Sequence, residues 1–231
     1  MQKDKEDFLV PLFVKTSRAE NVYEAIRKGI ISGYWKAGDR INDAELAKRY
    51  GVSRLSVREA LSKLVESRIL EKEYWKGYYV RKISMDEFEA IFEIRQSLEK
   101  LALHRIMTSG NTDVASELEK AVDKSESDLK SGNSEEFMKS DFSFHEILYR
   151  ESGNPWIPYI LSITKILIDI FRTIEKGDEF EKVAKASISE HRAVIEMIKR
   201  NDEKKAMENL ELHLENHKER VYKEYKKQAG K

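Results

Sequence analysis

Segment 42–81 constrains the fold of this chain more than any other stretch, because it holds two helical patterns separated by a very short turn. Asn42 with Glu45 three residues later forms a helix-capping box, and Gly51 is typical of a helix end. A second amphipathic pattern follows after a turn of about four residues. The two apolar faces consist of Leu46, Ala47 and Tyr50 in the first helix, and of Val57, Ala60, Leu61, Leu64 and Val65 in the second. The segment predicts two helices joined by a tight turn.

Basic residues lie near the start of the second predicted helix. Arg54 and Arg58 fall outside its apolar face, and Lys63 follows further along. A helix, a tight turn and a second helix with arginines at its N-terminal end form the geometry that lays a helix in the major groove of DNA. The pattern predicts a helix-turn-helix. We expect Arg54 and Arg58 to contact bases or phosphates, and Ser53 and Lys63 to contact the DNA backbone.

A hairpin is predicted directly after these helices. Two runs rich in β-forming residues, 69–74 and 78–81, flank Trp75, Lys76 and Gly77. A hairpin that follows a recognition helix is a wing, and the tip at Gly77 is expected to reach the neighbouring groove of the DNA.

A supporting helix is predicted upstream, where a capping box begins at Ser17. Its apolar stripe is made of Val22, Ile26 and Ile30. Residues 1–82 are therefore expected to form a winged helix-turn-helix domain with three helices and a β-hairpin wing. Residues 1–15 form a possible arm.

From Ser84 onward the pattern is helical throughout. Ser84 followed by two acidic residues is typical of an N-cap and a first helical turn. Turn-forming residues mark breaks at 108–111, 131–134, 153–155, 176–178 and 200–202. Short connections force antiparallel neighbours, so residues 83–231 are expected to form an antiparallel bundle of about six helices. The whole chain is predicted to be mainly α.

Charge divides the chain in the same place. Residues 1–82 hold 18 Lys and Arg against 12 Asp and Glu, whereas residues 83–231 hold 24 against 30, so net charges of +6 and −6 cancel. A basic segment attracts phosphate, and an acidic companion keeps the rest of the surface off DNA. The sequence has no cysteine, no apolar run near the roughly 18 residues of a membrane span and no signal-peptide pattern. We expect a cytoplasmic protein.

Segment 17–80 resembles the GntR family of bacterial transcription regulators. The resemblance is carried by AIRKGIISGYWKAGDRI, ELAKRYGVSRLSVREALSKL and KGYYV. The family usually has S-R-T-P-V-R-E-A-L in the middle block, so Leu55 and Ser56 depart from its Thr and Pro. We therefore expect Ser56 and Glu59 to start the helix as a capping box. Ala44 stands where many members have an arginine, which predicts a missing DNA contact.

Polar residues interrupt the apolar stripes of three predicted bundle helices. Asp141 and His145 lie four apart on an otherwise apolar face, and His191 and His213 lie within apolar stripes of later helices. Buried imidazole and carboxylate groups cost free energy unless they are paired or bind metal, and together they are a common ligand set for divalent ions. The alternative is that each histidine is an ordinary hydrogen-bonded core residue and that Asp141 and His145 satisfy each other.

The second half resembles the ligand-sensing FCD domain of GntR regulators. The matching blocks are EIRQSLEKLAL, DFSFHEILYRESGNPWI, EHRAVIEMIKRNDEKKA and His213-Leu214. In metal-binding members, the Asp and three His of these motifs hold one divalent cation, which the resemblance assigns to Asp141, His145, His191 and His213. Zinc is the first candidate, with nickel or manganese as alternatives. His217 shares a face with His213 and is the obvious substitute, whereas His104 is expected to be peripheral.

Open coordination positions on such an ion favour an anionic oxygen ligand, so a small carboxylate is the predicted effector. Arg95, in the E-x-R-x-x-L-E pattern of the family, and Arg220, about two turns past His213, are candidates to bind it. Either arginine could equally form a structural ion pair.

The sequence thus favours a homodimeric transcription regulator that represses from a pseudo-palindromic operator and responds to a carboxylate beside the metal. One alternative keeps the regulator but makes the metal purely structural. Another is a metal-dependent hydrolase, which the absence of an H-E-x-x-H motif disfavours, so we expect no enzyme.

Overall fold

The computed structural model describes residues 17–31, 34–111, 113–162, 164–165 and 180–229. The chain divides into two compact units, Met1–Lys82 and Ile83–Lys231. The predicted arm at residues 1–15 lies outside the described residues.

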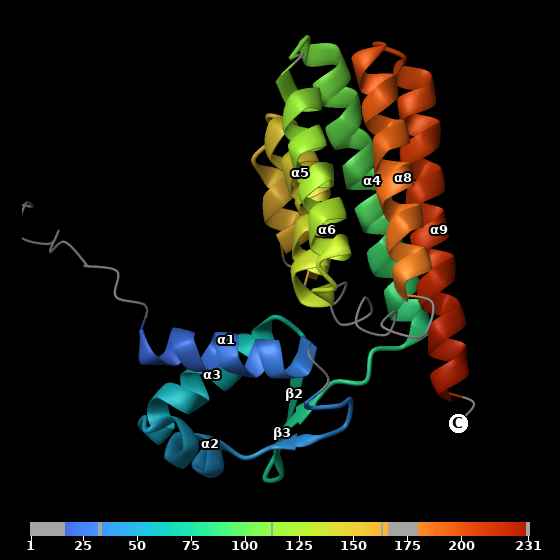
Figure 1. Cartoon of the computed structure of the whole chain (residues 1–231). Coiled ribbons are helices and arrows are strands. Elements are labelled where there is room, and N and C mark those ends of the chain that lie inside the picture. The colour runs from blue at the N-terminus through green and yellow to red at the C-terminus, as the bar shows by residue number, and fades with distance from the viewer. Residues whose placement is uncertain (1–16, 32–33, 112, 163, 166–179, 230–231) are drawn as a thin grey trace, which may run out of the picture. The chain divides into compact units, whose positions relative to one another are not determined.

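The N-terminal unit consists of three helices and a small sheet (Figure 1). Its elements in chain order are α1 (Arg18–Ile31), β1 (Arg40–Ile41), α2 (Asp43–Tyr50), α3 (Arg54–Glu66), β2 (Leu70–Glu73) and β3 (Gly77–Val80). Helix α1 packs on α3, and α2 packs on α3. The core between them is formed by Val22, Ile26, Ile30, Leu46, Ala47, Val57, Ala60, Leu61 and Leu64. The predicted winged helix-turn-helix is therefore confirmed.

Capping explains where the helices begin. The Ser17 hydroxyl accepts from the Glu20 amide at 3.1 Å, and the Asn42 side chain accepts from the Ala44 and Glu45 amides. The predicted capping box of Ser56 and Glu59 is wrong. Helix α3 is capped by Ser53, whose hydroxyl accepts from the Ser56 amide at 3.1 Å. Because this bond already satisfies an exposed amide of the first turn, the chain does not need the proline that the family usually has there.

Two details of the N-terminal unit differ from the sequence prediction. Tyr50 is 37% exposed rather than part of the core, because α2 is only eight residues long and Tyr50 ends it. The hairpin is joined by a third strand, β1, which pairs antiparallel with β3 through Arg40 opposite Tyr79 and Ile41 opposite Tyr78. A strand of two residues is too short to show alternation in the sequence.

The C-terminal unit is a bundle of long helices that run side by side (Figure 1). The bounds are α4 (Met85–Ser109), α5 (Asp113–Lys130), α6 (Ser134–Glu151), α8 (Phe180–Lys199) and α9 (Glu203–Ala229). Residues 156–162 are also helical. Each predicted break falls between two helices, except that the break at 176–178 lies outside the described residues.

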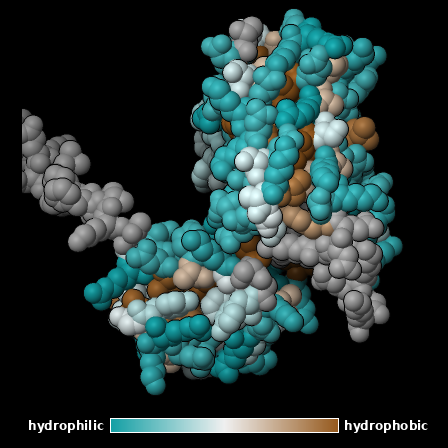
Figure 2. All heavy atoms as spheres, viewed as in Figure 1, coloured by the Kyte–Doolittle hydropathy of each residue, from teal (hydrophilic) through white to brown (hydrophobic). Residues whose placement is uncertain are grey.

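Helix α5 packs on α6 and α8, while α9 packs on α8 and α4. A continuous apolar core fills the bundle, with Phe92, Leu103, Leu118, Phe144, Leu148, Val194, Leu210 and Leu214 all fully buried. The visible face of this unit is mainly hydrophilic, with fewer apolar side chains showing among the hydrophilic ones (Figure 2). Among the described residues, no helix is long and apolar enough to cross a membrane.

Candidate DNA-binding surface and metal centre

The start of α3 presents two arginines to solvent. The Arg54 and Arg58 side chains are 60% and 59% exposed, and both pair with Asp43, the first residue of α2. Arg58 Nε donates to Asp43 Oδ2 at 2.8 Å, and Arg54 Nη2 lies 3.2 Å from Oδ1. Burial opposes ionisation of the carboxyl, but the hydrogen bonds from Arg58 and Arg54 outweigh it and lower the pKa of Asp43. An ionised Asp43 therefore holds both guanidinium groups together on the exposed face.

The other predicted DNA contacts lie at different places on the unit. Ser53 precedes Arg54 and caps the helix. Lys63 lies in the last turn of α3 and forms an ion pair of 2.7 Å with Glu20. Nine residues of helix put it about 14 Å from Arg54 along the axis. Gly77 opens β3 with a φ of +112°, a conformation that favours glycine.

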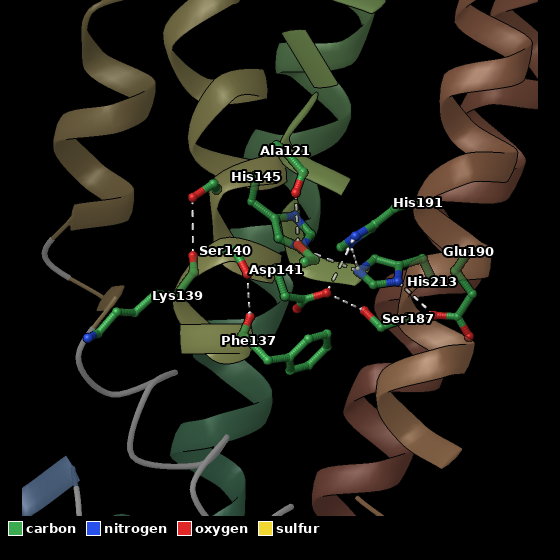
Figure 3. Close-up of polar contacts among 12 residues, drawn as sticks. Ala121, Phe137, Lys139, Ser140, Asp141, His145, Ser187, Glu190, His191 and His213 are labelled. Atoms are coloured by element: carbon green, nitrogen blue, oxygen red, sulfur yellow. Dashed lines mark hydrogen bonds and ion pairs between the residues drawn. The ribbon is translucent and has the colours of Figure 1, made fainter. Parts of the chain in front are cut away.

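Three histidines meet in the core of the C-terminal unit. His145 on α6, His191 on α8 and His213 on α9 are at most 2% exposed. Figure 3 shows the three rings pointing toward one another. His213 Nε2 lies 3.2 Å from His191 Nε2 and 3.3 Å from His145 Nε2. One nitrogen from each ring lies within 4.8 Å of the other two.

Each of these imidazoles turns its other nitrogen toward a carboxylate. His145 Nδ1 lies 2.8 Å from Glu99 Oε2, and His213 Nδ1 lies 2.7 Å from Glu190 Oε2. His191 Nδ1 lies 3.5 Å from Asp141 Oδ1. An ionised carboxylate only accepts hydrogen bonds, so the two short contacts assign the ring proton of His145 and of His213 to Nδ1 and leave a lone pair on Nε2 when each ring is neutral. The cluster therefore gathers lone pairs at its centre.

Electrostatics keeps the carboxylates charged and His145 neutral. Burial is the main reason why the pKa of His145 is lowered to about 4, with Arg95 acting in the same direction. Burial alone would raise the pKa of Glu99, but Arg95, His145 and Tyr149 outweigh it and the pKa is lowered. Glu190 behaves alike, because hydrogen bonds from His213 and Arg220 overcome its partial burial and lower its pKa.

The donor set fits a divalent cation. Two ligand nitrogens about 2.0–2.1 Å from a tetrahedral zinc stand about 3.3–3.4 Å apart. The two Nε2 separations from His213, 3.2 and 3.3 Å, agree with this value, and all three donors lie within 4.8 Å of one another. The Nδ1 contacts to carboxylates are the outer partners that metal-binding histidines commonly have. Neutral nitrogen lone pairs facing one another repel unless a cation or an additional proton lies between them.

Asp141, the fourth predicted ligand, lies at the edge of the cluster. It accepts from the Ser187 hydroxyl at 2.8 Å through Oδ1, the oxygen that faces His191 Nδ1. Figure 3 shows its carboxylate turned toward the three rings. The structure therefore brings all four predicted ligands to one place, with three of them at the centre and Asp141 beside them.

A small cavity of about 30 Å³ lies next to this cluster. Asp141, His145 and His213 line it, and so do the predicted effector residues Arg95 and Arg220.

Both arginines of the cavity already hold the carboxylates that orient the histidines. Arg95 is 1% exposed, and its Nε lies 2.6 Å from Glu99. Arg220 reaches Glu190 through Nη1 at 3.2 Å and Nη2 at 3.4 Å. Among the described residues nothing accepts a hydrogen bond from the buried Arg220 Nε. Each arginine therefore contacts a glutamate that in turn contacts a histidine of the cluster, which gives two separate Arg–Glu–His networks.

The remaining histidines differ from the cluster. His217 is buried, but its Nδ1 faces Arg95 Nη1 at 3.2 Å rather than the centre. The His104 side chain is 51% exposed, and its Nδ1 lies 2.6 Å from Glu203. The choice of His213 over His217 as the residue at the centre therefore agrees with the geometry, and His104 is peripheral as expected.

Sequence reasoning missed the carboxylates behind the histidines. Glu99 belongs to the same E-x-R-x-x-L-E pattern as Arg95 and lies four residues after it, so its helical spacing was a usable signal. Tyr149, whose hydroxyl donates to Glu99 at 2.6 Å, lies four residues after His145. Glu190 directly precedes His191 in the sequence, yet it supports His213. Local spacing gives no sign of that last contact.

A winged helix-turn-helix with exposed arginines at the recognition helix, followed by a separate helical unit with a buried histidine cluster, is the architecture of a DNA-binding regulator with a second, all-helical domain. Residues 18–80 match the model of the bacterial regulatory proteins of the gntR family, and residues 90–216 match that of the FCD domain. The chain belongs to the gntR family and carries an FCD domain. It is a DNA-binding transcription regulator, not an enzyme.

Relatives of similar length support this assignment. The uncharacterized HTH-type transcriptional regulator YdhC of Bacillus subtilis (strain 168) is 28% identical over 83% of this chain and 85% of its own. The gluconate operon transcriptional repressor of the same organism is 25% identical over 94% of this chain and 91% of its own. The structure of E. coli McbR/YncC has the same fold, with a TM-score of 0.74 at 20% identity, and covers 90% of this chain and 99% of its own.

Proposed function

We propose that this regulator represses transcription as a homodimer, and that a small carboxylate bound beside a divalent cation in the C-terminal unit controls its affinity for a pseudo-palindromic operator. The observation that carries the sensing half is the convergence of three Nε2 atoms whose Nδ1 partners are carboxylates. Buried polar groups in that arrangement are costly unless a cation or a shared proton joins them, and a cation can join all three at once. The proposed site of action is the cytoplasm, where bacterial operators lie.

The proposed cation is held by His145, His191 and His213, with Asp141 as the predicted fourth ligand. Imidazole donors with a carboxylate suit zinc, and nickel or manganese are the alternatives. When bound, the ion supplies a positive centre with open positions for an anionic oxygen. The chain itself orients the imidazoles through Glu99 and Glu190, and keeps His145 neutral by burying it.

The proposed effector is a small carboxylate that enters the cavity and pairs with Arg220. Arg220 is the better of the two predicted candidates, because its buried Nε has no hydrogen-bond acceptor among the described residues, whereas Arg95 is committed to Glu99 and His217. A carboxylate at Arg220 competes with Glu190, which also orients His213. Effector and cation binding would therefore be coupled through Glu190.

Two arguments support repression from a two-fold operator: the small size of the winged helix-turn-helix domain and the names of the relatives. One winged helix contacts only a few base pairs, so tight and specific binding needs two half-sites and two chains. Several relatives carry the name of repressor, among them the gluconate operon repressor of Bacillus subtilis. A change in the spacing of the two recognition helices would then change operator affinity.

The cation is tested by titrating chelator-treated protein with zinc chloride in a calorimeter. We expect one ion per chain for the native protein and loss of binding for His191→Ala. His104→Ala is the matched control, because His104 is an exposed histidine that pairs with Glu203 outside the cluster. Circular dichroism checks that both variants fold. Zinc binding by His191→Ala at the native affinity would contradict the proposed site.

The effector is tested with a panel of small mono-, di- and tricarboxylates added to the zinc-loaded protein on a selected operator duplex. We expect at least one of them to change operator affinity, and Arg220→Gln to weaken that response while zinc still binds. An Arg220→Gln response equal to the native one would remove Arg220 from the effector site.

A purely structural cation is the second candidate, and one observation favours it. The three histidines come from α6, α8 and α9, so an ion among them would fasten three helices together. Chelation followed by a thermal melt and a DNA-binding assay separates the two. If the metal-free protein melts at a lower temperature but responds to the carboxylate unchanged, the ion is only structural.

A further inference from the structure

The tip of the β2–β3 hairpin carries two aromatic side chains that the fold leaves in solvent. Trp75 is 96% exposed and Tyr74 is 81% exposed. The two rings touch edge to face, with centroids 5.5 Å apart and planes at 77°. Exposed apolar groups of this size usually mark an interaction site when they stand together.

The backbone places Trp75 at this tip in spite of its conformational preference. Trp75 has a φ of +67°, in the left-handed region that bulky residues avoid. The turn closes through a hydrogen bond of 3.2 Å from the Lys76 amide to the Glu73 carbonyl. Glycine or asparagine would fit the position at lower cost. Because Trp75 is almost fully exposed, packing within this chain does not compensate for that cost.

The surroundings of Trp75 are cationic and reach the recognition helix. A groove between β1, the start of α2, α3 and the hairpin is lined by Trp75 together with Arg40, Arg58, Lys72 and Lys76. Its acidic lining residues are Asp43 and Glu73, so four positive charges face two negative ones. The cores of protein–protein interfaces are depleted of charge, whereas a net positive groove beside an aromatic tip suits a polyanion.

We propose that Trp75, supported by Tyr74, is a wedge that enters the minor groove of operator DNA and partly unstacks one base step in each half-site. This inference rests on the proposed operator binding. Apolar side chains inserted from the minor groove unstack base pairs and bend the duplex, while nearby cations hold the phosphates on either side. Lys72 and Lys76, on the same hairpin, are the cations that would contact those phosphates.

The wedge has a consequence for sequence preference. Pyrimidine–purine steps such as TA and CA/TG unstack and kink most easily. The operator is therefore expected to carry such a step where the wing meets each half-site, although Trp75 forms no hydrogen bond that identifies a base. The specificity at this step comes from the deformability of the DNA.

The experiment uses the full-length chain and duplexes selected from a random library by their binding to it. The fluorescent base 2-aminopurine is placed in turn at each step that flanks the contacted half-site. We expect its fluorescence to rise severalfold at one step per half-site with the native protein, and a gel assay with permuted binding sites to report a bend. Trp75→Ala should lose both signals and at least tenfold in affinity, while Trp75→Phe keeps most of each.

Matched variants separate the wedge from general effects. Trp156→Ala removes another exposed tryptophan, 64% exposed on the C-terminal unit, and should change nothing. Lys76→Ala should weaken binding to all sequences and reduce the slope of log affinity against log salt by about 1. Trp75→Ala should leave that slope unchanged, because it removes no charge.

The outcomes are distinguishable. If native protein selects a duplex but Trp75→Ala binds and bends it equally and leaves the same 2-aminopurine signal, the wedge is overturned and the proposed operator binding stands. If Trp75→Ala instead alters self-association in sedimentation without altering DNA binding, the tip is a protein contact and the wedge is again overturned. If native protein selects no duplex, both proposals fail.

Discussion

The two units use the same chemical pair, an arginine with a carboxylate, in opposite ways. In the N-terminal unit, Asp43 holds Arg54 and Arg58, whose side chains are more than half exposed. In the C-terminal unit, Glu99 holds Arg95, and both side chains are at most 1% exposed. Exposed pairs contribute about 0–1 kcal/mol and can exchange partners. Breaking a buried pair costs about 3–5 kcal/mol. The first unit is suited to release its arginines to phosphate, and the second is suited to hold its groups still.

The largest expected effect breaks the buried pair. Glu99→Gln leaves Arg95 as a buried charge without its counter-ion and weakens the hold on His145. We expect the free energy of unfolding to fall by about 3–5 kcal/mol in urea denaturation. The control is Glu211→Gln, which removes an exposed ion pair with Lys100 and should change stability by less than about 0.5 kcal/mol. Equal effects of the two variants would end the contrast between the units.

The pH dependence of metal-free protein tests the same region through His145. Its pKa is lowered to about 4 in the folded chain, from an ordinary value of 6.5, chiefly by burial. Between these values the unfolded chain binds more protons than the folded one, so stability is full above pH 6.5 and falls as the pH drops toward 4. The loss amounts to about 3 kcal/mol at most. His145→Gln should flatten this part of the curve, measured by urea denaturation at each pH. A curve as steep as the native one would exclude His145 as its cause.

A smaller effect, on metal affinity, is expected in the partly buried network of Arg220, Glu190 and His213. Glu190→Gln keeps the shape of the side chain but weakens the orientation of His213 Nδ1. Loss of such an outer partner lowers metal affinity about 10–100-fold, to be measured by zinc calorimetry. Glu196→Gln is the control, because Glu196 lies on the same helix as Glu190 and forms only an exposed pair with Arg200. No difference between the two would mean that Glu190 does not position a ligand.

On the exposed side, Arg58→Ala should lower operator affinity by about 1–3 kcal/mol in a mobility-shift assay while leaving the fold intact. The side chain is 59% exposed and its ion pair with Asp43 is a surface pair, so stability should change by less than about 0.5 kcal/mol. Unchanged operator affinity would count against the assignment of α3 as the recognition helix.

The smallest effect is expected for Lys63→Ala. Lys63 pairs with Glu20 at the far end of α3, and an exposed pair of this kind contributes about 0–1 kcal/mol to stability. We expect less than a threefold change in operator affinity, roughly 0.6 kcal/mol by the usual conversion. A larger loss, with a shallower salt dependence, would establish the backbone contact that the sequence predicts for Lys63.

The comparison of sequence and structure separates two kinds of contact. Helix caps, apolar stripes and inward-facing histidines depend on neighbours within about one turn, so residues such as Asn42, His191 and His213 could be placed from spacing alone. The two-residue strand β1 could not, because its pairing partner β3 lies far along the chain. The contacts of Glu99 and Glu190 with His145 and His213 could not be predicted for the same reason, since these partners are 46 and 23 residues away. For Glu99, only its spacing of four residues from Arg95 was a signal in the sequence.

The amino-acid sequence by itself determined the winged helix-turn-helix domain and the helical second unit. It also determined that Asp141, His145, His191 and His213 point inward, because periodicity settles which face of a helix is buried. Only the tertiary structure decided that the three Nε2 atoms meet, that each Nδ1 faces a carboxylate, and that Arg95 and Arg220 already hold two of those carboxylates. Such contacts depend on how far one helix is rotated and shifted against the next. That rotation is set by the packing of the whole core, and no single stretch of sequence contains it.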